Sequence, residues 1–308
     1  MGKPNTTLGI EVGDTSLKLA LFDHKQHKVL RLGVVEVSAH PLREVELLEK
    51  AILQWMDYVP DTDSLSVVLA VPTRISVVRR IELPRELKDV REYVEWEFAN
   101  AINAPRGDYY MDFEVIKASG RHPALAIVGA MRKVWLDTVR KGFQRRNLVP
   151  SVVEVDAFSL LNLMEAGLQA QKTAIACIVK VDRTGVIVVW GQNGSLKAIR
   201  WVSVSLLSTM GRVDAFKGLA ADLTDQLHKG FAQVGVEEAA GQIVHLCGDL
   251  SVEADFVDAL RKSSPDFLYH LLDSFHRIQL DAEGASSNKA PLCAAAIGAA
   301  LRFRGDRK

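Results

Sequence analysis

The chain has 308 residues with 38 basic and 38 acidic side chains, and 48% of its residues are hydrophobic. This balance is typical of a folded globular protein and excludes a disordered, collagen-like or coiled-coil chain. A single hydrophobic core usually stops growing near about 250 to 300 residues, so two lobes are expected. Because the formal net charge is zero, there is no general electrostatic reason to bind a polyanion, and no nucleic-acid partner is expected.

The cysteines, the N-terminus and the apolar runs indicate a cytoplasmic protein. Cys177, Cys247 and Cys293 are far apart and lie in apolar runs, which suits neither a disulfide framework nor a zinc site. The first residues are polar, which does not match a secretory signal. The most apolar stretch, residues 291–301, is too short to cross a bilayer. We therefore expect contact with a membrane only indirectly, through a partner.

The first part of the chain predicts three strands, a helix and a further strand. Residues 8–12, 17–22 and 29–37 are rich in strand-forming side chains and are separated by turn residues, which predicts consecutive strands. Apolar residues at helical spacing predict an amphipathic helix over residues 41–59. The apolar run 65–71 predicts a buried parallel strand.

The next part predicts a smaller unit. Residues 75–83 predict a strand, and Pro84 is expected to open a helix over residues 85–102, with apolar residues four apart. Further elements are expected in the order strand, strand, helix, strand and helix, over residues 111–116, 124–130, 133–146, 152–155 and 157–166.

The second half repeats the order of the first. After a polar boundary at residues 167–173, strands are expected over 174–181, 186–191 and 196–204, with Asn193-Gly194 as a strong hairpin signal. The remaining expected elements are a helix, a strand and two helices, over residues 212–234, 243–247, 252–262 and 291–303. This repetition predicts an internal duplication.

Two such halves, with a glycine turn between the first two strands, resemble the superfamily of actin, Hsp70 and sugar kinases. Residues 8–19, LGIEVGDTSLKL, look like the first phosphate loop of the type IV pilus assembly protein PilM family. Residues 77–84, VVRRIELP, and 93–97, YVEWE, are similar to the small subdomain that this family shares in placement with the cell-division protein FtsA. Residues 155–161 and 296–302 extend the resemblance over nearly the whole chain.

The resemblance implies an α/β, actin-like (ribonuclease H-like) fold with duplicated βββαβα lobes. The first lobe, residues 1–168, would carry an inserted subdomain at about residues 75–150. The second lobe, residues 169–308, would lack most of the subdomain that covers adenine in such proteins. Only one long helix fits between the strands expected at 196–204 and 243–247.

By family position, the resemblance implies these nucleotide-binding residues: Gly13, Asp14, Thr15, Ser16, Lys18, Asp182 and Gly248. Glu11 stands where the family has an aspartate that helps organise magnesium, and Lys180 replaces an acidic residue of the second phosphate loop. Asp182 stands where backbone would approach phosphate, and Asp249 follows the glycine of the adenosine loop. A carboxylate about 4 Å from a phosphate costs on the order of 4 kcal/mol. The resemblance therefore implies a degenerate cleft with no catalytic residue and no metal site, in which ATP and Mg²⁺ bind only if the cleft still functions.

Several of these residues have a plainer interpretation. The residues from Gly13 to Ser16 suit an ordinary turn between strands as well as a phosphate loop. Lys18 suits the exposed face of a strand near a sheet edge as well as a phosphate contact. Val94 and Phe98 are typical of a core, although one side of their stripe could line a groove in a small subdomain.

The resemblance implies a cytoplasmic scaffold of a type IV pilus or related secretion platform. Such a scaffold would bind the cytoplasmic N-terminal tail of a PilN-like inner-membrane protein, in a groove between the first lobe and the inserted subdomain. Arg79, Arg80, Val94 and Phe98 are the expected partner-binding residues, and a solvated strand edge is the alternative for the two arginines. Other platform proteins and a second copy of the chain are further expected partners. Two other functions stay open: an ATP-binding actin-like switch or weak ATPase, and an FtsA-like filament former.

Overall fold

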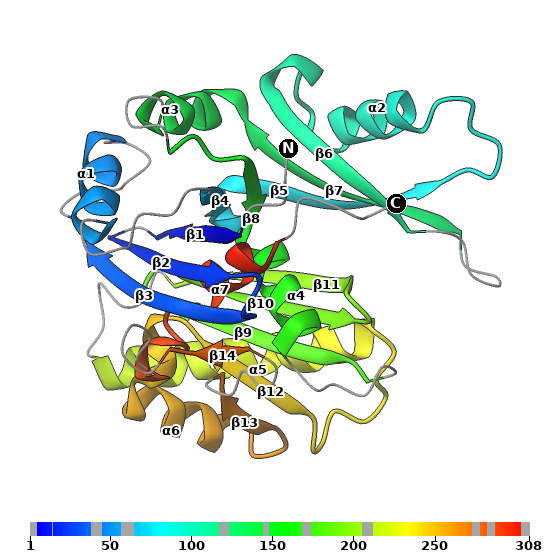
Figure 1. Ribbon diagram of the computed structural model, residues 1–308. Coiled ribbons are helices and arrows are strands. Elements are labelled where there is room, and N and C mark those ends of the chain that lie inside the picture. Colours follow the sequence, from blue (N-terminus) through cyan, green and yellow to red (C-terminus); the bar gives the residue numbers. More distant parts are fainter. Residues whose placement is uncertain are drawn as a thin grey trace.

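A computed structural model describes residues 5–13, 15–37, 45–56, 65–116, 123–143, 148–167, 174–204, 212–272, 278–281 and 287–302. These residues form two large β-sheets and one small sheet, with helices that cover or separate them (Figure 1). This arrangement agrees with the α/β class and the two duplicated halves that the sequence predicts.

The sheet of the first lobe has the strand order β14-β3-β2-β1-β4-β8. Its strands are β1 (Thr6–Val12), β2 (Ser16–Asp23), β3 (Lys28–Glu36), β4 (Leu65–Val71), β8 (Val152–Val155) and β14 (Gln279–Leu280). β2 is antiparallel to both β1 and β3, whereas β4 is parallel to both β1 and β8. Alternate residues of β1 point to opposite faces, so Leu8 and Ile10 pack toward α1 (Val45–Met56) and α3 (Lys133–Phe143).

The sheet of the second lobe has the order β11-β10-β9-β12-β13. Its strands are β9 (Ala176–Asp182), β10 (Gly185–Gln192), β11 (Ser195–Ser203), β12 (Ile243–Cys247) and β13 (Leu268–Leu271). One face is covered by α5 (Arg212–Gln233) and α6 (Ala254–Ser263), which bury a core around Trp190 and Phe231. Between β11 and β12, the described residues contain one helix, α5, as predicted.

Two helices separate the large sheets. α4 (Asp156–Gly167) and α7 (Ala294–Leu301) share one apolar cluster with residues of β2, β9 and β10 (Figure 1). Six of the eight residues of α7 are alanine or glycine, so backbones approach it closely. A Cβ added to Gly9 of β1 would lie 2.0 Å from the carbonyl oxygen of Ala296. α7 and β14, at the end of the chain, thus lie against the sheet of the first lobe.

The inserted subdomain has its own sheet, with the order β5-β7-β6. It consists of β5 (Ser76–Leu83), α2 (Val90–Ile102), β6 (Tyr109–Ile116) and β7 (Ala124–Arg132), and it extends away from the two lobes in Figure 1. Its core consists of side chains of α2 that pack on one face of the small sheet. β5 and β6 are the edge strands of this sheet.

The structure corrects several predicted boundaries. α2 begins at Val90 and not at residue 85, because the side chain of Asp89 caps the helix by accepting a hydrogen bond of 3.0 Å from the N–H of Glu92. α6 and α7 also begin later than predicted, at Ala254 and Ala294. β13 and β14 were not predicted, since strands of four and two residues carry little periodic signal.

Some predicted features lie outside the described residues. These are Asp14, the ends of the helix predicted over 41–59, and most of the boundary predicted at 167–173. Within the described part of the chain, no helix is long and apolar enough to span a membrane.

Candidate functional site

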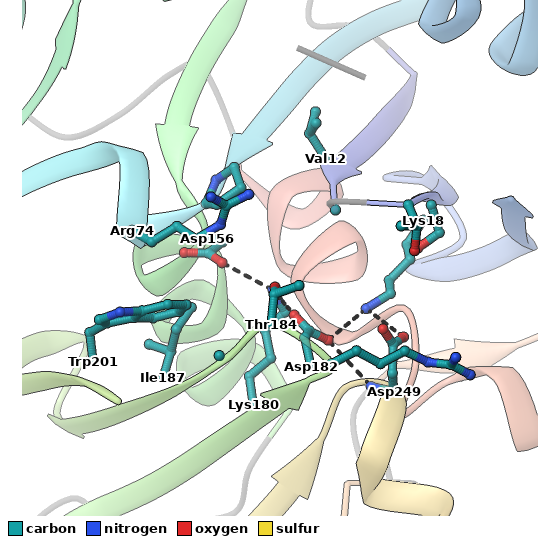
Figure 2. Close-up of a pocket in the computed structure, with 16 residues that line it drawn as sticks. Val12, Lys18, Arg74, Asp156, Lys180, Asp182, Thr184, Ile187, Trp201 and Asp249 are labelled. Carbon is teal, nitrogen blue, oxygen red and sulfur yellow. Dashed lines mark hydrogen bonds and ion pairs between the residues drawn. The ribbon is translucent and has the colours of Figure 1, made fainter. Parts of the chain in front are cut away.

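A small cleft opens where the two large sheets face each other. The end of β1, the start of β2 and the start of α4 approach it from the first lobe, while the ends of β9 and β12 approach it from the second (Figure 2). In parallel β/α folds, ligand sites form at such strand ends. The space open to water in this cleft is about 30 Å³, which is room for about two water molecules.

Lys180 lies at the centre of this cleft. Its ammonium nitrogen lies 2.6 Å from Glu11 Oε1, 2.7 Å from Asp182 Oδ2 and 3.0 Å from Asp156 Oδ2. Glu11 and Asp156 belong to the first lobe, whereas Lys180 and Asp182 belong to β9 of the second. The lysine that replaces an acidic residue of the family pattern therefore joins the two lobes.

Lys18 forms the second half of the network. Its ammonium nitrogen lies 2.9 Å from Asp182 Oδ1, 3.0 Å from Asp249 Oδ1 and 3.5 Å from Glu11 Oε1. Asp249 begins the short 3₁₀ helix Asp249–Val252 that follows β12. Figure 2 shows Lys18 pointing from the first lobe toward both aspartates. Asp182 thus holds one ammonium group with each of its two oxygens.

Burial and Coulomb attraction compete in this network. Burial alone lowers the pKa of Lys18, but attraction to Asp182 and Glu11 outweighs it and raises that pKa above its usual value. The pKa of Lys180 is raised in the same way, against the effect of burial, chiefly by Asp182 and Glu11. Burial raises the pKa of Asp182, yet the two lysines outweigh it and lower that pKa below its usual range. Both lysines and Asp182 are therefore charged at neutral pH.

The pKa of Glu11 is shifted in the opposite direction to the pKa of Asp182. The Glu11 side chain is 1% exposed, and burial raises its pKa despite the nearby ammonium groups of Lys18 and Lys180. Among the described residues its Oε2 has no hydrogen bond, and its Oε1 faces the ammonium groups of Lys180 and Lys18, so these two lysines compensate for its burial. Removing either lysine therefore leaves Glu11 poorly compensated.

Backbone groups that a phosphate would need are already used. The N–H of Gly13 donates to the carbonyl of Ser16 at 2.9 Å, which closes the turn between β1 and β2. The N–H of Gly248 donates to the carbonyl of Pro291 at 3.0 Å, and the N–H of Asp249 donates to Asp182 Oδ1 at 3.3 Å. The hydrogen bond between Gly13 and Ser16 is the one that a turn between two strands requires, which is one of the two interpretations of this segment.

The structure brings the predicted nucleotide residues together. Gly13, Thr15, Ser16, Lys18 and Asp182 all line the cleft, and Gly248 lies directly before Asp249 at its edge. Lys18 is buried, so the alternative of an exposed strand face is wrong. The resemblance assigned these residues to one site, but it did not predict the ion pair between Lys18 and Asp182.

Asp156 is the important residue of the site that the sequence interpretation did not assign. It begins α4 directly after β8, and its Oδ1 accepts hydrogen bonds from the N–H of Thr73 at 2.9 Å and from its hydroxyl at 2.5 Å. A carboxylate at the end of a predicted parallel strand is a signal that could have identified it. Arg74 and Arg183 also line the cleft and were not assigned.

This set of side chains does not fit a magnesium nucleotide. The carboxylates of Glu11, Asp156 and Asp182, which would have to face a cation, already face an ammonium group. Asp249 and Asp182 would lie beside phosphate charges. With the lysines in place, no group of three or more His, Cys, Asp or Glu side chains in the described chain is arranged to hold a metal ion.

The expected partner-binding residues lie in two different environments. Val94 and Phe98 are 0% and 2% exposed and belong to the core of the inserted subdomain, so their side chains cannot line a surface groove. This corrects the expectation, because both side chains pack in the core between α2 and the small sheet. Arg79 and Arg80 are exposed on the edge strand β5. Arg80 donates to the carbonyl of Lys197 at 2.7 Å, which connects the subdomain to β11 of the second lobe.

Comparisons with known proteins support the fold and the family. Residues 9–185 match a family model described as type IV pilus assembly protein PilM. No curated protein sequence gives a significant match. A solved structure described as a PilM-PilN type IV pilus biogenesis complex is similar, with a TM-score of 0.77 and 20% identity, covering 96% of this chain and 98% of that chain.

A second solved structure supports the same architecture. It is a Bacteroides thetaiotaomicron protein described as having an actin-like ATPase fold and unknown function, with a TM-score of 0.51 and 12% identity, covering 94% of this chain and 96% of that chain. At these identities the structural likeness concerns the fold, and it confirms the predicted actin-like α/β architecture. The family model spans more than half of the sequence. The chain therefore belongs to the type IV pilus assembly protein PilM family.

Proposed function

We propose that the chain is a scaffold of a type IV pilus or a related secretion platform, and that it binds the cytoplasmic N-terminal tail of a PilN-like inner-membrane protein. The observation that carries this proposal is the inserted subdomain, with an edge strand beside the second lobe. A scaffold of this family with such an edge can hold an extended tail. In this role the protein lies on the cytoplasmic side of the inner membrane, held there by its partner.

The edge of β5 is the best candidate for the tail. In the described chain β5 pairs only with β7, so its outer edge offers backbone groups to an added strand. Arg79 is exposed on this strand and makes no ion pair or hydrogen bond with other described residues. Its guanidinium group is available for a carboxylate or carbonyl of the tail. Arg80 differs, because it already holds Lys197 and therefore positions the subdomain.

The alternative of a nucleotide switch is less compatible with the cleft. A switch of this kind closes its lobes around a bound phosphate group, whereas ion pairs within the chain already connect the lobes here. Filament formation has no specific support in the described contacts. We therefore retain the scaffold as the proposed function.

Peptide capture tests this proposal directly. The immobilised N-terminal tail of the PilN-like protein should retain the wild-type chain in the absence of nucleotide. Arg79→Glu should weaken retention by about tenfold, which corresponds to about 1.4 kcal/mol. Arg261→Glu, on the exposed surface of α6, is the matched control and should bind like wild type. Failure of the wild-type chain to bind the tail would contradict the function, and unchanged binding by Arg79→Glu would contradict the placement on β5.

A further inference from the structure

Three carboxylate oxygens from three elements converge on one point in the cleft. Glu11 of β1, Asp156 of α4 and Asp182 of β9 each place an oxygen within 3.0 Å of the Lys180 nitrogen. Convergence of several oxygens from separate elements is typical of a protein site for a hard cation. A lysine ammonium carries three N–H donors. Lys180 thus provides one donor for each of these oxygens.

The unsatisfied oxygen of Glu11 supports this view. Glu11 Oε2 is buried and has no hydrogen bond to any described residue. Buried carboxylates normally receive hydrogen bonds, and those that lack them depend on a neighbouring positive charge. The nearest positive charges face the other oxygen of the same carboxylate, Oε1, with Lys180 at 2.6 Å and Lys18 at 3.5 Å. The Glu11 carboxylate therefore depends on these two ammonium charges, as a cation ligand depends on its cation.

The same charges connect the lobes. Lys180 of the second lobe contacts Glu11 and Asp156 of the first. Lys18 of the first lobe contacts Asp182 and Asp249 of the second. Ion pairs therefore cross the cleft in both directions. Neither lobe can move away without leaving buried charges unpaired, which is strongly unfavourable.

Asp156 extends this connection to the inserted subdomain. One of its oxygens contacts Lys180, and the other accepts both hydrogen bonds from Thr73. Thr73 begins the 3₁₀ turn Thr73–Ile75, which leads directly into β5. The hydroxyl of Ser76 closes the same turn on the carbonyls of Pro72 and Thr73 at 3.1 Å. Asp156 thus connects Lys180 of the second lobe to Thr73 at the base of the inserted subdomain.

We propose that the Lys180 ammonium permanently occupies the cation position of this cleft, and that the Lys18–Lys180 network holds the two lobes together and fixes the inserted subdomain without any bound nucleotide. This inference rests on the proposed function only where it concerns the partner tail. The network is an internal replacement for a cation and its phosphates. Partner binding by this chain is then independent of ATP.

Removing the lysine should convert the position into a metal site. In Lys180→Ala the three carboxylates surround an empty space, so the variant should be less stable by at least about 6 °C in melting temperature. Millimolar CaCl₂ should restore a large part of this loss in a saturable manner. MgCl₂ should be less effective, because Ca²⁺ accepts oxygens at about 2.3 to 2.6 Å and Mg²⁺ needs about 2.0 to 2.1 Å. The wild-type melting temperature should not change with either metal.

Two variants serve as controls. Lys229→Ala removes a lysine from an exposed ion pair with Asp225 on α5, and it should neither lose stability nor respond to metal. The double variant Lys180→Ala with Glu11→Gln should lose most of the calcium response. If Lys180→Ala does not fold without metal, its refolding is compared in CaCl₂ and in EDTA. Protein that is soluble after refolding in CaCl₂ but not in EDTA supports the proposal. Aggregation in both conditions, or a Lys180→Ala variant that calcium does not stabilise, overturns it.

Tail capture tests the connection to the subdomain separately. Wild type should bind the PilN-like tail equally with EDTA and with Mg²⁺-ATP, whereas Lys180→Ala should bind about tenfold more weakly in EDTA and recover in calcium. A wild-type chain that needs Mg²⁺-ATP to bind the tail would overturn the inference. A wild-type chain that never binds the tail would contradict the proposed function, while the calcium response of Lys180→Ala still tests the cation position.

Discussion

A Cβ atom added to Gly298 of α7 would lie 1.9 Å from the carbonyl oxygen of Ser159 of α4. Real side chains do not approach a backbone oxygen so closely, so the two helices are in contact through their backbones at this point. α7 also contacts β1 closely at Gly9. Small residues in α7 therefore allow it to fit between the large sheets.

We expect that Gly298→Ala destabilises the protein by about 1 to 3 kcal/mol, because overpacking forces the two helices apart. Urea denaturation followed by circular dichroism measures this change. Gly107→Ala is the matched control, since no atom lies within 4 Å of its added Cβ, and it should change stability by less than about 0.5 kcal/mol. Equal unfolding midpoints for the two variants would show that the contact between α4 and α7 is adaptable.

The sequence predicts the fold well where the signal is local. The three strands from β1 to β3 were placed by alternation and turn residues, and the Asn193-Gly194 turn has the expected positive φ angles of 52° and 69°. β14 could not be predicted in this way, because its two residues are defined only by pairing with β3. The start of α2 was missed because the cap at Asp89 competes with Pro84 as a helix start, and sequence alone did not rank them.

The site was predicted only in part, for a related reason. Glu11 and Lys18 are opposite each other in the β1–β2 hairpin, and the short turn fixes this pairing locally. Their contacts with Lys180 and Asp249 depend on the docking of two lobes, which no short-range pattern specifies. Lys180 and Asp182 were therefore interpreted as losses from a nucleotide site. The structure shows that they form new ion pairs with the first lobe.

We expect that Asp182→Asn lowers stability at pH 7 by about 3 to 5 kcal/mol, because both lysines lose a buried partner. The pKa of Asp182 in the folded protein lies below its ordinary value of 3.8, because the two lysines outweigh the effect of burial. Its stabilising effect is therefore present above about pH 3.8 and is lost as the pH falls further. The difference between wild type and variant should shrink below that pH.

Chemical denaturation at pH 7 and at pH 3 measures this prediction. Glu11 shifts in the opposite direction but is present in both proteins, so comparing the two removes most of its effect. Asp214→Asn, from an exposed pair with Lys217 on α5, is the control and should have little effect at either pH. An Asp182→Asn variant as stable as wild type at pH 7 would show that the cleft charges are not coupled to folding.

The end of the chain suggests another pH-dependent test. Glu154 is buried in β8, receives a hydrogen bond of 2.6 Å from Ser159, and forms an ion pair with Arg302, which directly follows α7. Burial raises the pKa of Glu154, and Arg302 partly opposes this rise. Arg302→Ala should therefore destabilise the protein by about 1 to 3 kcal/mol at pH 8. Because the folded pKa then rises further, the loss should decrease as the pH falls and Glu154 takes up a proton.

Thermal unfolding of Arg302→Ala between pH 8 and pH 5 measures this effect. Arg302→Lys keeps the positive charge and should retain most of the stability. Arg261→Ala removes an exposed arginine with a weak 4.0 Å contact to Asp258, and it should show no pH-dependent loss. A loss in Arg302→Ala that is the same at all pH values would indicate lost packing of the arginine side chain and not a lost charge.

Nucleotide titration tests whether the cleft is closed to ligands by its own charges. Isothermal titration of wild type with Mg²⁺-ATP should give no saturable heat in the micromolar range, and no ATP turnover should be detected. The physical reason is occupancy as well as repulsion: Lys18 and Lys180 already hold carboxylates, and the N–H groups of Gly13 and Gly248 already donate to carbonyls.

Asp249→Asn separates occupancy from repulsion. If repulsion alone prevented binding, this variant would gain affinity by nearly three decades, whereas occupancy by the ammonium groups predicts that binding stays weak. A dissociation constant below about 10 µM for wild type would contradict the closed cleft and favour a nucleotide switch.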